Sequence, residues 1–246
     1  MCGIIGYVST DGKHTIKPEQ IKKMLVKCQS RGKDSTGIYS IGSRKKYGQV
    51  QKNNVQASEF INQADWSVVE KAQVVLGHCR HATQGTPKLA QNNHPLIKNE
   101  LILIHNGVVY NDHEFGIDKK TCDSYAILEA ITRSRKKSMR GRVIDGLKDL
   151  SGSIACAIFD QEHKDLYLFR NNMPIVIGFN RNTISFASTG EILSPARPLT
   201  TFNVREDSLV HINLKSGLMR TTTINTRRTY SYGTQASYTY TYNGKV

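Results

Sequence analysis

The second residue of the chain, Cys2, carries a thiol at a position where it could act as a nucleophile. Because a small residue follows Met1, we expect Met1 to be removed, which would leave a free α-amine on Cys2 itself. An α-amine has a reference pKa of about 7.7–8.0, so it can accept a proton near neutral pH. Cys2 would then supply both the nucleophile and the base of a covalent reaction.

Further along the chain, several segments are rich in polar residues of the kinds that bind substrates, and three of these segments also contain glycine. A glycine in such a segment lets the main chain approach a ligand closely. The segments are 30–37 (SRGKDSTG), 77–85 (GHCRHATQG), 92–95 (NNHP), 105–111 (HNGVVYN) and 122–124 (CDS).

Together these segments resemble, in order and spacing, the glutaminase domain of class II glutamine amidotransferases. The likeness is closest to the glutaminase half of glucosamine-6-phosphate synthase, through CGIIG, RGxDSxG, GHxRxATxG, NxHP and HNGVV. It covers about residues 2–125, and the strand-rich segment to about residue 220 fits the rest of such a domain. The resemblance implies an enzyme that hydrolyses the side-chain amide of free L-glutamine to glutamate and ammonia through a Cys2 thioester.

The resemblance also assigns the residues that would stabilise the reaction. Hydrolysis of an amide passes through an oxyanion, which requires hydrogen-bond donors already in place. The side-chain amide of Asn106 and the backbone N–H of Gly107 match these donors, so the implied catalytic residues are Cys2, Asn106 and Gly107.

Free glutamine must also be held by its α-carboxylate and its α-amine. Arg80 matches the position that binds the carboxylate, and Thr83 lies nearby as a hydroxyl donor. Asp123 can pair with the substrate ammonium, and His94 is a candidate wall of the site. One departure concerns His81, which stands where close relatives usually carry Trp or Tyr.

Each of these residues also has a structural interpretation. Arg80 and Asp123 could form an ion pair with each other, and Asn106-Gly107 could be a type I′ hairpin turn. Asp123 could instead cap the N-terminus of a helix. The five segments in family order favour the functional interpretation.

Short apolar runs bounded by turn residues predict a domain that is rich in strands. Three helices are expected over 18–29, 123–134 and 143–150, and hairpin turns over 180–182 and 215–217. This pattern predicts an α+β fold, and the resemblance implies the N-terminal-nucleophile hydrolase type, an αββα sandwich of two mainly antiparallel sheets between helices. The expected strands are 2–9, 37–41, 74–76, 101–105, 153–159, 166–169, 175–179, 184–187 and 209–214.

The 246 residues suit one substantial domain, which we expect over 2–226. Residues 227–246 differ in composition: two arginines are followed by five tyrosines, three of them alternating with threonine. This basic tail could be an edge strand or a docking segment. Five scattered cysteines, and a start without a signal sequence or a long apolar run, predict a cytoplasmic protein without a disulfide framework or a membrane span.

The chain carries 34 Lys and Arg against 20 Asp and Glu, a formal charge of +14, which can attract nucleic acid or an acidic protein. No nucleic-acid motif accompanies the charge. The chain also shows no phosphate-binding GxxxxGK[ST] loop and no acceptor domain, so we expect no cofactor, and we expect ammonia to pass to a separate synthase subunit.

Three other functions fit parts of the sequence. One is hydrolysis of another amide on the same fold, which the Arg80 and Asp123 pairing with a zwitterion disfavours. A second is a non-catalytic basic binding module, which the intact Cys2, Asn106 and Gly107 disfavour. The third is a metal protein, disfavoured because His78 and His81 would face opposite sides of a strand; its candidate ligands are His78, His81, His94, His105 and His113.

Overall fold

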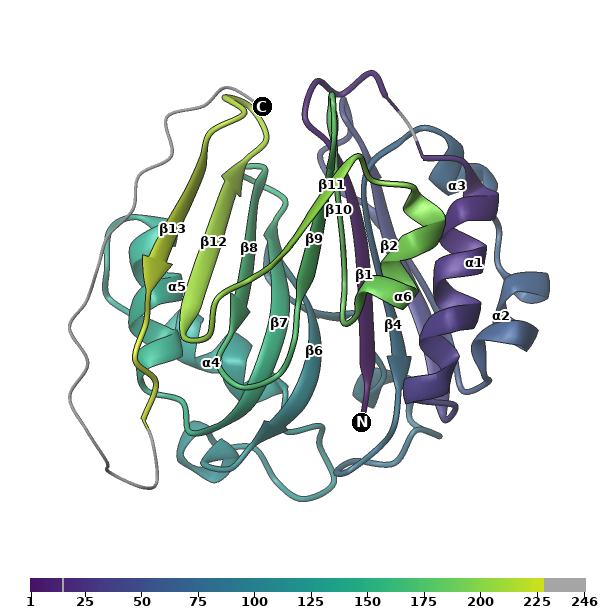
Figure 1. The fold of residues 1–246 in the computed structure, drawn as a ribbon. Helices are drawn as coiled ribbons and strands as arrows, with labels where there is room; N and C mark the ends of the chain where they lie inside the picture. Colours follow the sequence, from purple (N-terminus) through teal and green to yellow (C-terminus); the bar gives the residue numbers. More distant parts are fainter. Residues whose placement is uncertain (15, 228–246) are drawn as a thin grey trace.

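Two β-sheets face each other at the centre of the molecule, and helices cover both outer faces (Figure 1). The computed structural model describes residues 1–14 and 16–227. The first sheet has seven strands in the order β11-β9-β10-β1-β4-β2-β3, and the second has six in the order β13-β12-β8-β7-β6-β5. Neighbouring strands in both sheets are antiparallel. The fold is therefore the predicted αββα sandwich.

The first sheet consists of β1 (Gly3–Ser9), β2 (Ser35–Gly42), β3 (Gln49–Asn53), β4 (Ala72–Arg80), β9 (Val176–Asn180), β10 (Thr183–Ala187) and β11 (Thr200–Asn203). The second consists of β5 (Leu96–Lys98), β6 (Leu101–Val109), β7 (Gly152–Asp160), β8 (Asp165–Arg170), β12 (Ser208–Asn213) and β13 (Met219–Thr223). The helices are α1 (Pro18–Cys28), α2 (Ala57–Gln63), α3 (Ser67–Glu70), α4 (Tyr125–Arg133), α5 (Met139–Lys148) and α6 (Gly190–Leu193). Short 3₁₀ turns are η1 (Gln29–Arg31), η2 (Ala90–Asn92), η3 (Asp112–Phe115) and η4 (Ser194–Ala196).

Three buried apolar layers hold these elements together. The central layer lies between the sheets, and β1 contributes Ile4 and Val8 to it. The same strand sends Ile5 and Tyr7 to the opposite side, where α1, α2, α3 and α6 pack. A third layer joins the second sheet to α4 and α5. Because successive side chains of a strand alternate between its faces, both faces of each central strand are buried.

Every strand predicted from the sequence is present, although the ends differ by a few residues. The strands that the sequence did not reveal are β3, β5, β11 and β13, which are short and largely polar or exposed. The three predicted helices are present as α1, α4 and α5, and Pro18 occupies the first turn of α1. The predicted turns over 180–182 and 215–217 join β9 to β10 and β12 to β13.

Two of the structural alternatives that the sequence left open are not found. Residues Asn106 and Gly107 lie within β6 rather than in a hairpin turn. Helix α4 begins at Tyr125, and Asp123 does not cap it, because Ser124 occupies the capping position and makes no side-chain capping bond.

The predicted Tyr-rich tail, residues 227–246, lies outside the described residues except for Arg227, which forms an ion pair with Glu114 at 3.0 Å. None of the helices within residues 1–14 and 16–227 combines the length and apolar composition that crossing a membrane requires.

Packing in the central layer should make the free energy of unfolding sensitive to substitution of Phe159. The fully buried ring of Phe159 on β7 lies 5.9 Å, centroid to centroid, from the ring of Tyr39 on β2, so it bridges the two sheets. Phe159→Ala should lower the free energy of unfolding by about 3–5 kcal/mol, as measured by urea denaturation. Leu199→Ala, at a side chain that is 81% exposed, should change it by less than about 0.5 kcal/mol. Equal effects would contradict this account of the core.

Candidate active site

Strand alternation directs several predicted site residues into the layer between the sheets. Ile4 of β1, Leu76 of β4 and Ile104 of β6 all belong to the central apolar cluster. Residues two positions away along a strand share its face. Cys2 and Asn106 therefore point toward the central layer from opposite sheets, and β1 packs against β6 across it.

Cys2 precedes β1 and sits against the end of β4. Its sulfur lies 3.3 Å from both the backbone nitrogen and the carbonyl oxygen of His81. Its own carbonyl accepts a 2.8 Å hydrogen bond from Nε of Arg31, a residue of the RGxDSxG segment. These contacts hold Cys2 from two sides, so the segment at 30–37 positions the nucleophile.

Desolvation raises the pKa of the Cys2 thiol to about 11 in the chain that still carries Met1. The hydrogen bond from the His81 backbone and the charge of Arg80 act in the opposite direction, but burial outweighs them. The neutral thiol is therefore the resting form near pH 7. A base must remove its proton for the sulfur to attack a carbonyl.

Gly3, which follows Cys2, could not be replaced by a larger residue without moving its surroundings. A Cβ atom at Gly3 would lie 2.3 Å from Sγ of Cys28 at the end of α1. The end of α1 therefore packs directly against the start of β1, at the residue that follows Cys2.

Asn106 is fully buried, and neither Nδ2 nor Oδ1 of its side chain has a hydrogen-bond partner within the described residues. An unsatisfied buried amide costs free energy, so it is retained where it serves a ligand or a reacting group. Gly107 adopts φ +141°, and a Cβ there would lie 1.7 Å from the carbonyl oxygen of Ser153. Only glycine fits this position beside Asn106.

Three buried histidines surround the backbone of Asn106. Nε2 of His78 lies 2.8 Å from the carbonyl oxygen of His105, the residue before Asn106. The His78 ring also stacks on the His94 ring at 4.2 Å. Nδ1 of His105 lies 2.8 Å from Oγ of Ser124.

Burial keeps these histidines neutral. It lowers the pKa of His78 to about 3 and also lowers the pKa values of His94 and His105. A carbonyl oxygen can only accept a hydrogen bond, so Nε2 of His78 must carry the hydrogen. His78 therefore holds the peptide group that leads into Asn106. The sequence placed His78 only among possible metal ligands and missed this contact.

Arg80 is buried at the end of β4, and its guanidinium holds the loop that follows. It donates to the carbonyl oxygens of Gln84 at 2.6 Å and Gly85 at 2.8 Å, and to Oδ1 of Asn93 at 3.0 Å. The proposed Arg80–Asp123 ion pair is not formed in the described structure. A guanidinium has five N–H donors, so two remain for a ligand.

Asp123 lies in the segment before α4, and its buried carboxylate reaches β6. Its Oδ2 accepts a 2.7 Å hydrogen bond from the backbone nitrogen of Val109, and Oδ1 lies 3.7 Å from Sγ of Cys122. This bond fixes the carboxylate of Asp123 beside Val109, which lies two residues after Gly107 in β6. Each carboxylate oxygen can accept a further hydrogen bond.

The other two predicted binding residues differ in exposure. Thr83 is exposed in the loop after β4. His94 is buried, and neither of its ring nitrogens has a hydrogen-bond partner in the described part of the chain. Like the amide of Asn106, its polar atoms are available to a ligand.

A network of polar side chains that the sequence analysis did not single out fixes the loop over 85–91. Asn92 binds the backbone of Thr86, Lys120 and Cys122, and so joins this loop to the segment that carries Asp123. Gln84 donates to Oδ2 of Asp112 at 2.6 Å. In the sequence these residues appear only as amides between apolar strands. Several of their hydrogen-bond partners lie about 30 residues away along the chain, so the local sequence does not reveal the network.

The histidines of the metal alternative do not share a centre. His81 and His113 have mostly exposed side chains, whereas His78 and His94 are buried. Within residues 1–14 and 16–227, the acidic and imidazole side chains close enough to share an ion are Asp160, Glu162 and His163. Asp160 pairs with Leu101, at the end of β6 remote from Asn106.

Comparison with known proteins agrees with this geometry. A family model described as a glutamine amidotransferase domain matches residues 78–195. The glutamine–fructose-6-phosphate aminotransferase of Bacillus licheniformis is 30% identical over 194 residues, which cover 74% of this chain and 31% of that protein. The corresponding enzyme of Helicobacter pylori is 26% identical over 214 residues, covering 79% of this chain and 33% of that protein. These matches support a class II glutamine amidotransferase domain in this chain.

Solved structures give the same fold for the amidotransferase domain. The glutamine phosphoribosylpyrophosphate amidotransferase of B. subtilis superposes with a TM-score of 0.76 at 21% identity, over 92% of this chain and 50% of that one. A glutamine aminotransferase class-II domain protein from Silicibacter pomeroyi superposes with a TM-score of 0.57 over 91% of this chain. The chain spans about a third of the length of the curated relatives that it matches.

The raised pKa of Cys2 predicts the pH dependence of its alkylation. In a form with an N-terminal extension that prevents methionine removal, a pKa of about 11 leaves about 10⁻⁴ of the thiol ionised at pH 7. Because only the thiolate reacts, the rate of iodoacetamide labelling should rise about tenfold per pH unit from pH 7 to 9.5. Mass spectrometry of the Cys2 peptide measures this rate. A plateau near pH 8.5, about the ordinary cysteine pKa, would contradict the desolvated environment.

Proposed function

We propose that this amidotransferase domain hydrolyses the side-chain amide of free L-glutamine to glutamate and ammonia through a thioester on Cys2. The observation that carries the proposal is the fully buried, unpartnered side-chain amide of Asn106 on β6, a strand that packs against β1, which Cys2 precedes. A thiol supplies the nucleophile, and a preorganised amide supplies the oxyanion donor.

The proposed reaction begins once Met1 has been removed. The α-amine of Cys2 takes the proton of its own thiol, and the sulfur attacks the side-chain carbonyl of glutamine. The resulting oxyanion accepts hydrogen bonds from Nδ2 of Asn106 and from the backbone N–H of Gly107. The protonated amine then gives its proton to the leaving nitrogen, and ammonia departs.

Water completes the cycle. The α-amine of Cys2, now neutral, takes a proton from a water molecule that attacks the thioester carbonyl. The carbon–sulfur bond breaks, glutamate is released, and the proton returns to the sulfur. An amine with a pKa near the working pH serves in both directions.

The substrate's charged groups would be held by residues at the rim of the layer. The two free N–H donors of Arg80 would bind the α-carboxylate, with Thr83 as a hydroxyl donor nearby. Asp123 would accept the α-ammonium beside its bond to Val109, and His94 would form a wall. This pairing selects a free zwitterion over a glutamine within a protein.

We further propose that the ammonia passes to a separate synthase. The relatives are about three times as long as the matched segment, so they hold chemistry that this amidotransferase domain does not span. The loop over 85–91 and the turn over 31–36 are the segments proposed to close on glutamine, because both are bonded to residues of the site: Arg80 binds Gly85, and Arg31 binds Cys2.

The nucleophile is tested by intact mass and by substitution. The active protein should lack the mass of one methionine residue, because only then is the α-amine on Cys2. Cys2→Ser should lower glutamate production severely, since a hydroxyl is a far weaker nucleophile than a thiol. The matched control is Cys156→Ala, at a buried cysteine on β7, which should remain active. Full retention of Met1 in active enzyme would overturn the proposed base.

Binding and catalysis should separate in two further variants. Arg80→Lys loses the planar fork and should chiefly raise KM for glutamine. Asn106→Ala removes an oxyanion donor and should lower kcat by about 10²–10³-fold. Steady-state ammonia release measures both constants. The reverse pattern would show that the two roles had been exchanged.

The hydrogen bond from His78 to the His105 carbonyl predicts a positioning effect on Asn106. His78→Phe keeps a ring to stack on His94 but loses the donor, and kcat should fall about tenfold, as expected when a hydrogen bond of about 1.4 kcal/mol is lost. His78→Gln keeps a donor and should restore most of kcat, with KM unchanged in both variants. Equal losses in the two variants would indicate a packing role only.

A further inference from the structure

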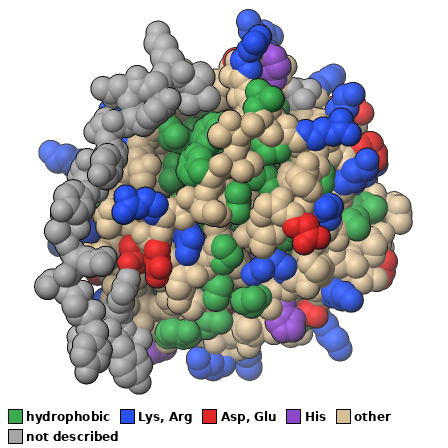
Figure 2. Space-filling model, in the orientation of Figure 1, with side chains coloured by type: hydrophobic (Ala, Val, Ile, Leu, Met, Phe, Trp, Pro, Cys, Tyr) green, Lys and Arg blue, Asp and Glu red, His purple; other side chains and the backbone are tan. Residues whose placement is uncertain are grey.

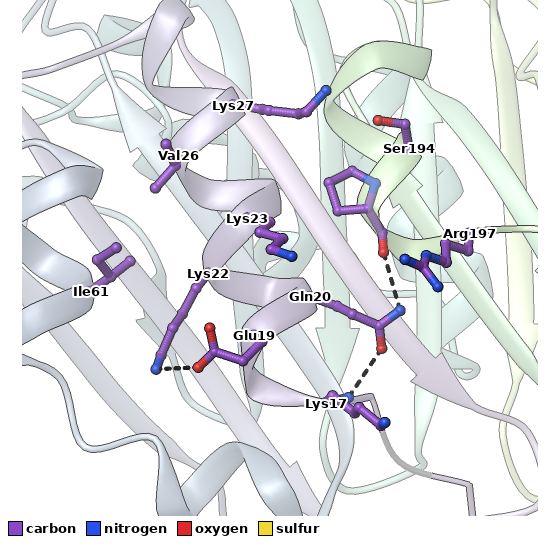
Figure 3. Close-up of a pocket in the computed structure, with 11 residues that line it drawn as sticks. Lys17, Glu19, Gln20, Lys22, Lys23, Val26, Lys27, Ile61, Ser194 and Arg197 are labelled. Atoms are coloured by element: carbon purple, nitrogen blue, oxygen red, sulfur yellow. Dashed lines mark hydrogen bonds and ion pairs between the residues drawn. The ribbon is translucent and has the colours of Figure 1, made fainter.

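A hollow of the described structure lies away from the proposed site, on the helical layer that covers the first sheet. Its volume is about 880 Å³, and α1 runs along it from Lys17 to Lys27, flanked by Ile61 of α2 and by η4 (Figure 3). At 1.5 Å per residue, that stretch of α1 is about 15 Å long. The hollow is a groove rather than a pocket for a small ion.

Its charge is strongly one-sided. Among the described residues, five cationic side chains and one carboxylate line the groove, and that carboxylate, Glu19, is bonded to Lys22 at 2.6 Å. The cations are Lys17, Lys22, Lys23, Lys27 and Arg197. Figure 2 shows Lys and Arg side chains gathered on the side of the molecule where Figure 1 places α1.

Apolar side chains lie among these cations. Val26, which is 40% exposed on α1, lines the groove together with Ile61 and Pro195. The groove wall is held by a 3.1 Å hydrogen bond from Gln20 to the carbonyl of Pro195, which ties α1 to η4 (Figure 3). Val26 and Ile61 lie on the α2 side of α1, and Pro195 lies on its η4 side (Figure 3). The surface therefore offers apolar side chains on both sides of a positively charged helix.

We infer that this groove docks an acidic amphipathic helix of a protein partner. A helix laid in a groove presents apolar anchors at intervals of three and four residues and charged residues beside them. Lys23 and Lys27 stand one turn apart on α1, which matches carboxylates spaced by one turn on an opposing helix. Val26 would meet its apolar face.

The lining distinguishes this partner from nucleic acid. Proteins that bind single strands stack bases on aromatic side chains, and none of the groove residues within 1–14 and 16–227 is aromatic. The indole of Trp66, near α1, is covered by Lys22 at 5.3 Å from the ring centroid. The neighbouring apolar side chains of Val26 and Ile61 would find no apolar partner on a phosphate backbone, whereas they suit the apolar face of a helix.

Docking there would leave the proposed site free. Helix α1 packs on the outer face of the first sheet, through Ile21, Met24 and Leu25, whereas Cys2 points toward the layer between the sheets. An occupant of the groove and a glutamine molecule would therefore lie on opposite faces of β1 and β4.

The test uses the full chain and three fluorescent probes of equal charge in an anisotropy titration. Two are peptides of about 18 residues with identical acidic and leucine content, one patterned as an amphipathic helix and one scrambled; the third is a short single-stranded DNA. We expect the patterned peptide to bind most tightly, with an affinity that falls as salt is raised.

Matched variants assign the binding to the groove. The triple variant Lys23→Glu, Lys27→Glu, Arg197→Glu should bind the patterned peptide at least about tenfold more weakly. The control Arg44→Glu, Lys45→Glu, Lys46→Glu changes the net charge by the same amount at an exposed basic cluster elsewhere. It should lower the affinity for the patterned peptide far less. Val26→Asn should lower the affinity for the patterned peptide and leave the affinity for the DNA unchanged. Unchanged thermal melting would show that the variants are folded.

Several results would overturn the inference. Tighter binding of DNA than of the patterned peptide, lost in the groove variant, would make the groove a nucleic-acid site. Equal binding of the patterned and scrambled peptides, or equal weakening by both triple variants, would reduce it to general charge attraction. Absence of peptide binding at low salt would also contradict it.

Discussion

The alternation of side chains along β1, β4 and β6 is the constraint on which the site depends. These strands bury both faces, so one set of side chains must fill the central layer and the other must pack against helices. Polar residues at the strand ends fall on the same faces as the apolar residues that precede them. Cys2 and Asn106 consequently meet the central layer, and a shift of one residue in either strand would turn them away from it.

Burial then sets the chemical state of the groups in this layer. The thiol of Cys2 and the rings of His78 and His94 are all held in their neutral forms, because desolvation makes charge costly there. The buried amide of Asn106 has no hydrogen-bond partner within the described residues. A low-dielectric layer with one oriented donor strengthens any interaction with a developing negative charge. The cost of burying these groups is offset by the large apolar core around them.

The loops around the site are ordered by contacts between distant segments. Arg31 binds the backbone of Cys2, and Asn92 joins the loop over 85–91 to the segment that carries Asp123. Arg80 serves both as a strand residue and as the anchor of that loop. The site is thus continuous with its surroundings, whereas the basic groove on α1 belongs to a different face of the first sheet. The proposed site and the basic groove therefore lie on opposite faces of the first sheet.

The sequence by itself predicted the amidotransferase domain and most of the strands, and it selected Cys2 as the candidate nucleophile. These depend on local order: a cysteine at position 2, polar segments in a fixed sequence, and apolar runs between turns. It also identified Asn106 and Asp123, but it left their structural alternatives open. Only the tertiary structure decided that Asn106 lies inside a strand, that Asp123 binds Val109 rather than a helix end, and that His78 supports the His105 carbonyl. Those outcomes depend on which strands become neighbours across a sheet or a layer, and pairing between distant segments is not encoded in the local pattern of any one of them.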